Sequence, residues 1–238
     1  MQKPLTGKTA LVTGAAGPIG WAACQVLAED GCDVIAADIH AEGLEGENIR
    51  ALVLDVSDPD AVKAAAGQVG QVDILVNNAG VLSNHKSAGT TADEWRRVMS
   101  VNLDGAFYLS QAFLPGMREK GWGRIINMAS LAMKVGGITA GTAYTTSKGG
   151  MAALTFSLAR EVAAEGVTVN AIAPAYVMTP MVSEQLTEEQ RQKILGDIPV
   201  GRFCEPEEVV HAVRFLVSPL AGFITGEIID INGGLHFD

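Results

Sequence analysis

The sequence predicts a single-domain α/β protein, a doubly wound sheet of seven mostly parallel strands with helices on both faces. Apolar runs rich in β-branched residues alternate with longer helical patterns, which is typical of a parallel sheet covered on both sides. A chain of 238 residues suits one such domain, because it can bury roughly three quarters of the surface that it exposes when unfolded. The content of 48% hydrophobic and 18% charged residues also fits a compact fold with well-buried strands.

Seven apolar runs are the predicted strands. They occupy residues 9–13, 33–37, 51–55, 72–76, 124–128, 167–171 and 227–231. The segments between the strands contain the predicted helices. These occupy residues 19–28, 60–68, 92–119, 143–164 and 206–216.

Two connections depart from this alternation. Only twelve residues, 39–50, separate the second strand from the third, which is close to the minimum for a crossover between parallel strands. Their helix should therefore be one or two turns long. Residues 176–202 interrupt the strand rhythm and contain a helical patch at 187–195, which by itself indicates an ordinary surface helix.

Composition excludes several classes of protein. The net charge of −10 argues against a nucleic-acid partner, because binding to phosphates needs Lys and Arg, and it also disfavours an acidic protein partner. No apolar run reaches the roughly 20 residues that span a bilayer, and no secretory signal is visible, so we expect a cytoplasmic protein. The three cysteines have no Cys-x-x-Cys spacing, which fits a reducing compartment. The four histidines show no metal-binding spacing, so we expect no metal.

Tyr144 and Lys148 form the most informative pair in the chain. Side chains four residues apart share one face of a helix, with β-carbons about 5–6 Å apart. A cation this close favours a phenolate and lowers the pKa of a neighbouring acid by about 1–3 pH units. Tyr144 could then exchange protons near neutral pH.

The glycine-rich turn at residues 13–20 predicts an anion site. It follows a strand and precedes a helix, so that backbone N–H groups and the positive end of the helix dipole meet at one point, which suits a pyrophosphate. Alone, the turn could also be a purely structural strand-to-helix connection. Asp38 strengthens the cofactor interpretation, because an acid at the end of the second strand can accept hydrogen bonds from ribose hydroxyls and repels a 2′-phosphate. The sequence therefore predicts NAD over NADP.

Taken in order, five features resemble the classical short-chain dehydrogenase/reductase family. They are the glycine turn, Asn77-Asn78-Ala79-Gly80, Asn102, Ser130 and Tyr144-x-x-x-Lys148. The resemblance runs from about Gly7 to the end of the chain. It implies a Rossmann-like fold and an oxidoreductase that interconverts a secondary alcohol and its ketone by hydride transfer.

The resemblance also implies roles for four residues. Ser130 would hydrogen-bond the substrate oxygen while Tyr144 acts as general acid/base. Lys148 would lower the pKa of the tyrosine and hold the nicotinamide ribose, and Asn102 would anchor a water that connects the lysine to solvent. Taken one at a time, Ser130 could be a capping serine, Tyr144 a packing tyrosine and Lys148 a solvated lysine. The interval from Ser130 to Tyr144 is one residue longer than is common in the family, so the pocket wall between them is expected to differ.

For the cofactor, the resemblance implies a longer set of contacts. Pro18 replaces the middle glycine of the family turn, Asp55 could instead be a turn carboxylate, and Thr179 could be a turn residue before Pro180. Neither Ala15 nor Ala16 offers the basic group with which NADP-using relatives hold the phosphate. The predicted cofactor-binding residues are Gly14, Gly17, Pro18, Ile19, Gly20, Asp38, Ile39, Asp55, Val56, Asn78, Ala79, Gly80, Tyr144, Lys148, Pro174, Val177 and Thr179.

The predicted substrate site is mainly apolar. Its residues are Ser130, Leu131, Ile138, Thr139, Ala140, Tyr144, Tyr176, Met181 and Val182, and the family resemblance makes residues 176–202 a substrate-covering loop. These side chains suit a largely apolar secondary alcohol or ketone. Lys134 is the nearby cation.

Two other functions stay open. The first is a 3-oxoacyl-(acyl-carrier-protein) reductase, although such enzymes usually take NADP and dock an acidic carrier on basic residues, where this chain has the acidic stretch 160–166. The second is a non-catalytic dinucleotide-sensing protein that kept the fold. The resemblance further implies a homotetramer, with helices 92–119 and 143–164 paired across one two-fold axis and the last helix and strand across another. The carboxyl end, residues 233–238, could then reach a neighbouring subunit's pocket.

Overall fold

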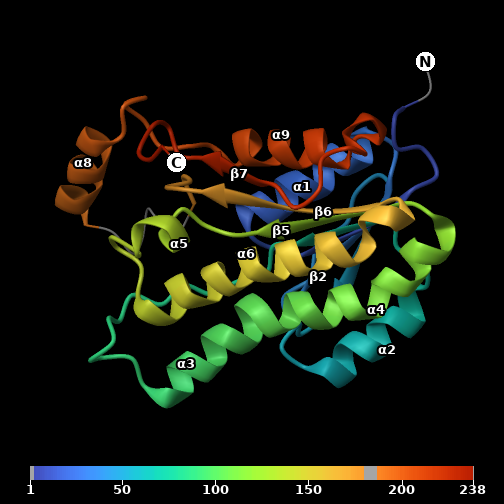
Figure 1. Ribbon diagram of the computed structural model, residues 1–238, viewed down its shortest axis with the longest axis horizontal. Helices are drawn as coiled ribbons and strands as arrows, with labels where there is room; N and C mark the ends of the chain where they lie inside the picture. Colours follow the sequence, from blue (N-terminus) through green and yellow to red (C-terminus); the bar gives the residue numbers. More distant parts are fainter. Residues whose placement is uncertain (1–2, 180–186, 238) are drawn as a thin grey trace.

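The computed structural model describes residues 3–179 and 187–237. Within these ranges one sheet contains seven strands, all parallel, in the order β3-β2-β1-β4-β5-β6-β7 (Figure 1). The strands are β1 Thr9–Thr13, β2 Asp33–Asp38, β3 Ile49–Val53, β4 Ile74–Asn77, β5 Gly123–Met128, β6 Val167–Pro174 and β7 Ile228–Ile231. The predicted doubly wound α/β fold is confirmed.

Helices connect the strands and cover both faces of the sheet. The α-helices are α1 Pro18–Glu29, α2 Pro59–Val69, α3 Ala92–Met99, α4 Gly105–Lys120, α5 Ala132–Val135, α6 Thr142–Val162, α8 Glu188–Asp197 and α9 Pro206–Val217. Three short turns complete them: the π-helical η1 Ser100–Asp104 and the 3₁₀ segments η2 Ala163–Glu165 and η3 Pro219–Ala221. None of the described helices is both long and apolar enough to cross a membrane.

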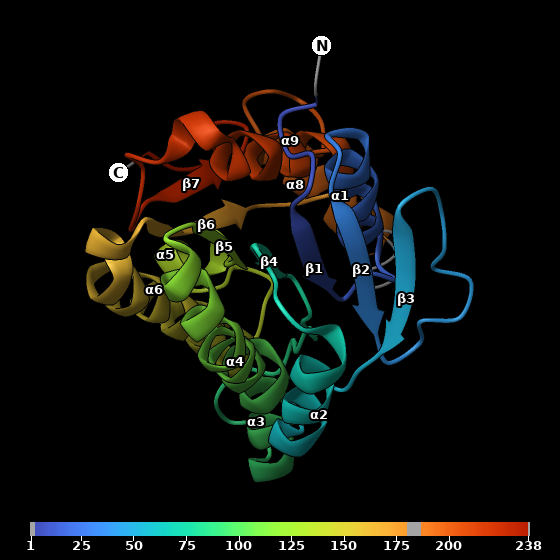
Figure 2. The ribbon, with the colours of Figure 1, turned by 90° about the vertical axis from the view of Figure 1, so that its right-hand side faces the viewer.

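Alternation along the strands divides the core into two layers. In β1, Ala10 and Val12 pack into the layer that contains α1 and α9, whereas Leu11 packs into the layer beneath α2, α4 and α6. Figures 1 and 2 show these helices on opposite sides of the sheet, with β3 and β7 at its two edges. Because successive strand side chains point to opposite faces, a uniformly apolar run fills both layers at once.

Two predicted elements differ in the structure. Residues 39–48 form turns and a single antiparallel bridge instead of a short helix, and the third strand begins at Ile49 instead of Ala51. Gly43 and Asn48 both have positive φ in this connection, which an α-helix does not allow. The predicted long helix over 92–119 is interrupted at η1. In this π-helical turn, which contains Asn102, each backbone hydrogen bond spans five residues instead of four.

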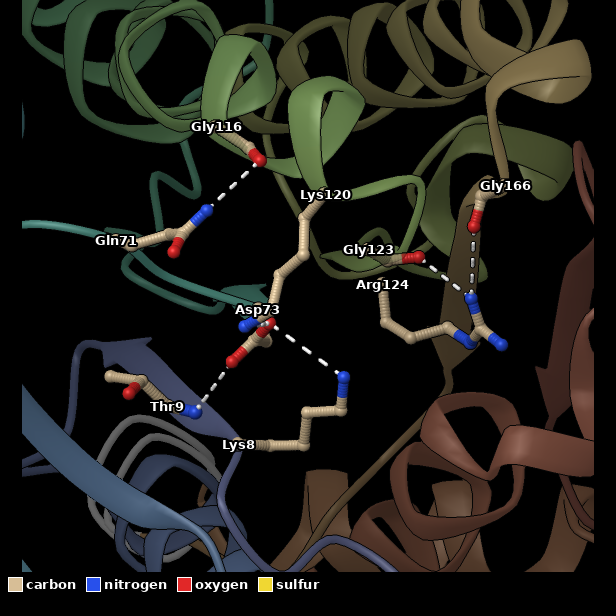
Figure 3. Close-up of polar contacts among 9 residues, drawn as sticks. All are labelled: Lys8, Thr9, Gln71, Asp73, Gly116, Lys120, Gly123, Arg124 and Gly166. Atoms are coloured by element: carbon tan, nitrogen blue, oxygen red, sulfur yellow. Dashed lines mark hydrogen bonds and ion pairs between the residues drawn. The ribbon is translucent and has the colours of Figure 1, made fainter.

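Asp73 connects three elements at the amino-terminal end of the sheet (Figure 3). Its side chain is buried and accepts a hydrogen bond from the Thr9 amide at 3.0 Å. Lys120, the last residue of α4, donates to the same carboxylate, and the Lys8 ammonium lies 3.8 Å from it. Arg124 lies nearby and donates to the carbonyl oxygens of Gly123 and Gly166.

We expect Asp73→Ala to lower the free energy of unfolding by about 3 kcal/mol, because it leaves a buried amide and two ammonium groups without their acceptor. Urea unfolding at neutral pH measures this change. The matched control is Asp93→Ala, which removes an ion pair that is almost fully exposed and should leave the unfolding curve nearly unchanged. Equal effects of the two substitutions would contradict a structural role for Asp73.

Candidate active site

A cavity of about 450 Å³ opens beside the carboxyl ends of the central strands. It lies where the strand order reverses, between β1 and β4, the place where open α/β sheets bind their ligands. The described residues that line it are Gly14, Ala16, Gly17, Pro18, Ile19, Gly20, Asp38, Asn78, Gly80, Met128, Ala129, Ser130, Tyr144, Lys148, Pro174, Ala175, Val177 and Thr179. We call it the glycine-lined cavity.

The turn from β1 into α1 requires glycine at two positions. Gly14 has a φ of +65°, and a β-carbon there would lie 2.8 Å from the Ala79 α-carbon. At Gly20 a β-carbon would lie 2.1 Å from the Gly14 carbonyl oxygen. Pro18 occupies the first turn of α1, so it costs no helical hydrogen bond. The first-turn amides of Ile19 and Gly20 have no acceptor within the helix and are available to an anion in this cavity.

Asp38 is fixed at the end of β2 on the same cavity. One carboxylate oxygen accepts from the Ala16 amide and the other from the His40 amide, each at 3.0 Å. Both contacts are from backbone donors, and the carboxylate has lone pairs free for further donors. The side chain at position 16 therefore lies directly beside this carboxylate.

Four residues predicted for the cofactor do not line this cavity. Ile39 is 58% exposed, and Val56 is buried against Gly105. The Asp55 carboxylate accepts from the amide and hydroxyl of Ser57, which is the turn role left open from the sequence. Ala79 donates its amide to the Thr13 hydroxyl. Conversely, Ala16, Met128, Ala129 and Ala175 line the cavity without having been predicted, because small or apolar side chains give no sequence signal when they contribute mainly backbone.

Tyr144, Ser130 and Lys148 meet at the inner end of the glycine-lined cavity. Tyr144 and Lys148 lie one turn apart on α6, and the Lys148 Nζ is 5.7 Å from the centre of the Tyr144 ring. Ser130, from the segment after β5, lines the same cavity, and its hydroxyl accepts from the Ala132 amide at 3.2 Å. The Lys148 ammonium donates to the Met128 carbonyl oxygen at 2.6 Å. Two hydroxyl groups and one ammonium are thus brought together from two elements.

The prediction that Lys148 lowers the pKa of Tyr144 is wrong for this arrangement. Burial raises the pKa of Tyr144 above its ordinary value, and the neighbouring Ser130 side chain opposes this only in part. Lys148 is itself buried, and burial lowers its pKa to about 8, so that it is still mostly protonated at pH 7. Tyr144 is therefore a protonated phenol near neutral pH, able to donate to an oxygen atom.

The low pKa of Lys148 predicts a pH-dependent stability. Between about pH 8 and 10.5 the unfolded lysine is protonated and the folded one is not, so stability rises with pH across this window. Below about pH 8, keeping the buried lysine protonated lowers the free energy of unfolding by about 3 kcal/mol. We expect Lys148→Met to remove this pH-dependent contribution. The difference in unfolding free energy between the variant and the wild type, measured by urea unfolding, should therefore fall by about 3 kcal/mol from roughly pH 7 to pH 10.5. Lys63→Met, on the exposed side of α2, is the control, and a pH-independent difference for Lys148→Met would contradict the assignment.

Asn102 occupies η1 and uses its whole side-chain amide. Its Oδ1 accepts from the Val81 amide at 2.8 Å, and its Nδ2 donates to the Val81 carbonyl oxygen and to the Ser147 hydroxyl. Ser147 in turn donates to the Tyr144 carbonyl oxygen at 2.7 Å. Asn102 therefore ties the chain after β4 to the turn of α6 that contains Tyr144 and Lys148. Ser147 was not predicted, because a serine inside a helix more often bonds only its own helix.

A second cavity, of about 400 Å³, adjoins the first and shares Ser130, Tyr144 and Ala175 with it. We call it the apolar cavity. Besides these three, its described lining is Leu82, Asn84, Leu131, Ala132, Val135, Ile138, Thr139, Ala140, Tyr176, Gln190 and Leu235. Seven of the residues predicted for the substrate are among them, and Met181 and Val182 lie outside the described residues. Lys134 does not line the cavity and forms an ion pair with Asp230.

The carboxyl end of the chain reaches this cavity from its own subunit. Leu235 lines the apolar cavity and packs with Tyr176, Ile198 and Phe203. Within its own chain Leu235 thus belongs to the cavity wall, and a contact of residues 233–238 with a neighbouring subunit stays a prediction. No sequence pattern indicated this position of Leu235, because the contact depends on how α8 and the segment after β7 fold against each other. Figure 1 shows α5 and α8 at the end of the sheet toward which β6 points.

Comparisons with known proteins agree with this geometry. The profile of a family described as Enoyl-(Acyl carrier protein) reductase matches residues 14–236. The chain is 42% identical over 243 residues to a 3-oxoacyl-(acyl-carrier-protein) reductase of Vibrio cholerae, covering 98% of each protein. It is 40% identical to nodulation protein G of Azospirillum brasilense, covering 98% of this chain and all of that protein. A 3-oxoacyl-(acyl-carrier-protein) reductase of Thermotoga maritima is 38% identical, with 97% of this chain covered and 98% of the relative. The chain therefore belongs to the classical short-chain dehydrogenase/reductase family and is an oxidoreductase.

Proposed function

We propose that this protein reduces the 3-oxo group of an acyl thioester to the 3-hydroxy group, with NADH as the reductant. The observation that supports this most is that Ser130 and Tyr144 line both cavities, at the place where the two adjoin. A carbonyl oxygen between these hydroxyls would have its carbon at the boundary of the glycine-lined cavity. Several relatives whose names describe this reaction match the chain almost from end to end.

The side chains where the two cavities adjoin suit the reduction of a ketone. Ser130 would donate a hydrogen bond to the ketone oxygen, and the protonated Tyr144 would transfer its proton to that oxygen as the alcohol forms. Lys148, with a pKa of about 8, can change its protonation state near the working pH and is close enough to support that transfer. The nicotinamide, when bound, supplies the hydride. Asn102 and Ser147 would keep the active turn of α6 in register with the chain after β4.

The residues of the glycine-lined cavity fit a dinucleotide, and NAD more than NADP. Gly14 and Gly20 leave room for a pyrophosphate beside the first turn of α1. The Asp38 carboxylate would accept from ribose hydroxyls, and it would repel a 2′-phosphate at the same place. Ile39, Asp55, Val56 and Ala79 stay predicted contacts that this cavity does not include.

A second candidate is an NAD-dependent dehydrogenase of small, neutral secondary alcohols. It is favoured by one feature, which is that the described lining of the apolar cavity contains no charged side chain. Its polar side chains beyond Ser130 and Tyr144 are amides and hydroxyls, those of Asn84, Thr139, Tyr176 and Gln190. A neutral ketone needs no more than this.

Initial rates with purified protein separate the two candidates. Acetoacetyl thioesters of coenzyme A and of an acyl carrier protein would be compared with simple ketones, each with NADH and with NADPH. Our proposal expects the highest kcat/KM for a thioester with NADH. Turnover of simple ketones at equal or higher kcat/KM would favour the second candidate, and a clear preference for NADPH would contradict the role of Asp38.

We further propose a homotetramer in the cytoplasm. Large apolar side chains are exposed on two surfaces, at Phe107 and Phe156 on α4 and α6, and at Phe215, Leu220 and Phe223 on α9 and the segment after it. Two separate apolar surfaces fit two different two-fold contacts. The three cysteines are all free, as expected in a reducing compartment. Analytical ultracentrifugation should give about four times the 24.9 kDa chain mass.

A further inference from the structure

One wall of the apolar cavity has no regular structure of its own. It is the segment between α5 and α6, residues 136–141, from which Ile138, Thr139 and Ala140 line the cavity. The segment begins with Gly136 and Gly137, whose φ angles are +75° and +70°. Two successive glycines leave a backbone unusually free, so contacts from elsewhere must fix the position of this wall.

Lys86 supplies those contacts from a different part of the chain. Its ammonium donates to the carbonyl oxygens of Gly137 at 2.5 Å and Ala140 at 2.6 Å, and lies 3.4 Å from that of Ile138. An ammonium has three donors and no acceptor, so one lysine can hold three carbonyl groups that converge on it. All three acceptors belong to the same stretch of four residues.

The segment that contains Lys86 is itself firmly held. The Lys86 carbonyl oxygen accepts from the amides of Gly89 and Thr90 and from the Thr90 hydroxyl. Glu94 of α3 binds the Ser83 hydroxyl and the His85 ring on the same segment. These hydrogen bonds hold the segment of residues 83–90 in place, so the position of Lys86 is itself fixed.

The same segment, residues 83–90, also contacts the start of α6. The carbonyl oxygens of Ser83 and His85 accept from the amides of Gly141 at 2.6 Å and Thr142 at 3.0 Å. Gly141 has no room for a side chain, since a β-carbon would lie 2.4 Å from the His85 carbonyl oxygen. These contacts fix the far end of the wall without Lys86, so the lysine controls the stretch between Gly137 and Ala140.

That stretch lines the apolar cavity together with Tyr176. The Thr139 hydroxyl lies 3.3 Å from the Tyr176 hydroxyl. We propose that Lys86 is a positioning residue that holds the Gly137–Ala140 wall and thereby determines which substrates the cavity accepts. The substrate part of this inference rests on the proposed reduction of 3-oxoacyl thioesters, and the wall part does not.

Two measurements on Lys86→Met test the inference. We expect the backbone NMR order parameters of residues 137–140 to fall from about 0.85 to below about 0.6, with those of α6 beyond its first turn unchanged. We expect KM for an acetoacetyl thioester to rise about tenfold with kcat within about twofold of wild type, because Lys86 contacts neither Ser130, Tyr144 nor Lys148. The preference for a four-carbon over an eight-carbon 3-oxoacyl chain should also fall.

The control is Lys63→Met, which removes an exposed lysine from α2 and should change neither measurement. Unchanged order parameters in residues 137–140 would overturn the inference. A fall in kcat at constant KM would also overturn it, because it would place Lys86 in the chemical step. If the wild type reduces no thioester, the proposed function fails, while the order parameters still decide whether Lys86 holds the wall.

Discussion

Tyr144→Phe should lower kcat for ketone reduction by about 10³-fold, which corresponds to about 4 kcal/mol of transition-state stabilisation. The variant lacks only the hydroxyl group of a tyrosine that lines both cavities. The remaining lining of the glycine-lined cavity is unchanged, so NADH should still bind with nearly the wild-type affinity. Stopped-flow or steady-state rates, with NADH binding followed by fluorescence titration, measure the two quantities separately.

Tyr108→Phe provides the matched control. It removes a phenolic hydroxyl from a half-buried tyrosine on α4, which lines neither cavity, and should leave kcat close to wild type. Survival of turnover in Tyr144→Phe to within about tenfold, a difference of ~1.4 kcal/mol, would mean that another group donates the proton. Loss of NADH binding together with turnover would instead point to a structural defect.

The double variant Asp38→Asn with Ala16→Arg should change the cofactor preference almost as strongly as Tyr144→Phe changes kcat. The first substitution removes the negative charge at the end of β2, and the second places a guanidinium beside it, since the Ala16 amide lies 3.0 Å from the carboxylate. At an effective dielectric constant of about 20, a unit charge pair at ~4 Å is worth about 4 kcal/mol. We therefore expect the ratio of kcat/KM with NADPH to that with NADH to rise by about 10²–10³-fold.

Asp33→Asn is the control for this change. Asp33 is an exposed carboxylate at the opposite end of the same strand, and its loss changes the net charge as much as Asp38→Asn alone does, without touching the glycine-lined cavity. A wild-type enzyme that already prefers NADPH would contradict the assignment of Asp38. So would a double variant in which both cofactors lose activity equally.

The sequence predicted the sheet well because its strands are uniformly apolar and short. Runs such as residues 9–13 and 167–171 gave the strands that the structure contains, with ends shifted by a few residues at most. The connection 39–48 was mispredicted for a definable reason. Asn48 adopts a positive φ, which is uncommon for a residue other than glycine and which no local pattern indicated.

In the site, prediction succeeded where side-chain chemistry is distinctive. Tyr144, Lys148, Ser130 and Asp38 were predicted to lie together, and they share one cavity. Residues that contribute through backbone or through distant packing were missed, including Ala175 and Leu235. The pKa of Tyr144 was mispredicted because spacing along a helix indicates proximity to a cation but not the degree of burial, and here burial has the larger effect.

The most direct test of the central claim is to follow the hydride itself. NADH deuterated at both C4 positions would be incubated with an acetoacetyl thioester and either the wild type or Tyr144→Phe, and the product analysed by mass spectrometry. We expect the wild type to yield a 3-hydroxyacyl thioester that contains one deuterium atom, at C3, and the variant to yield almost none. A product without deuterium, or equal labelled product from both proteins, would contradict the assignment of the Ser130–Tyr144 junction as the place where the ketone is reduced.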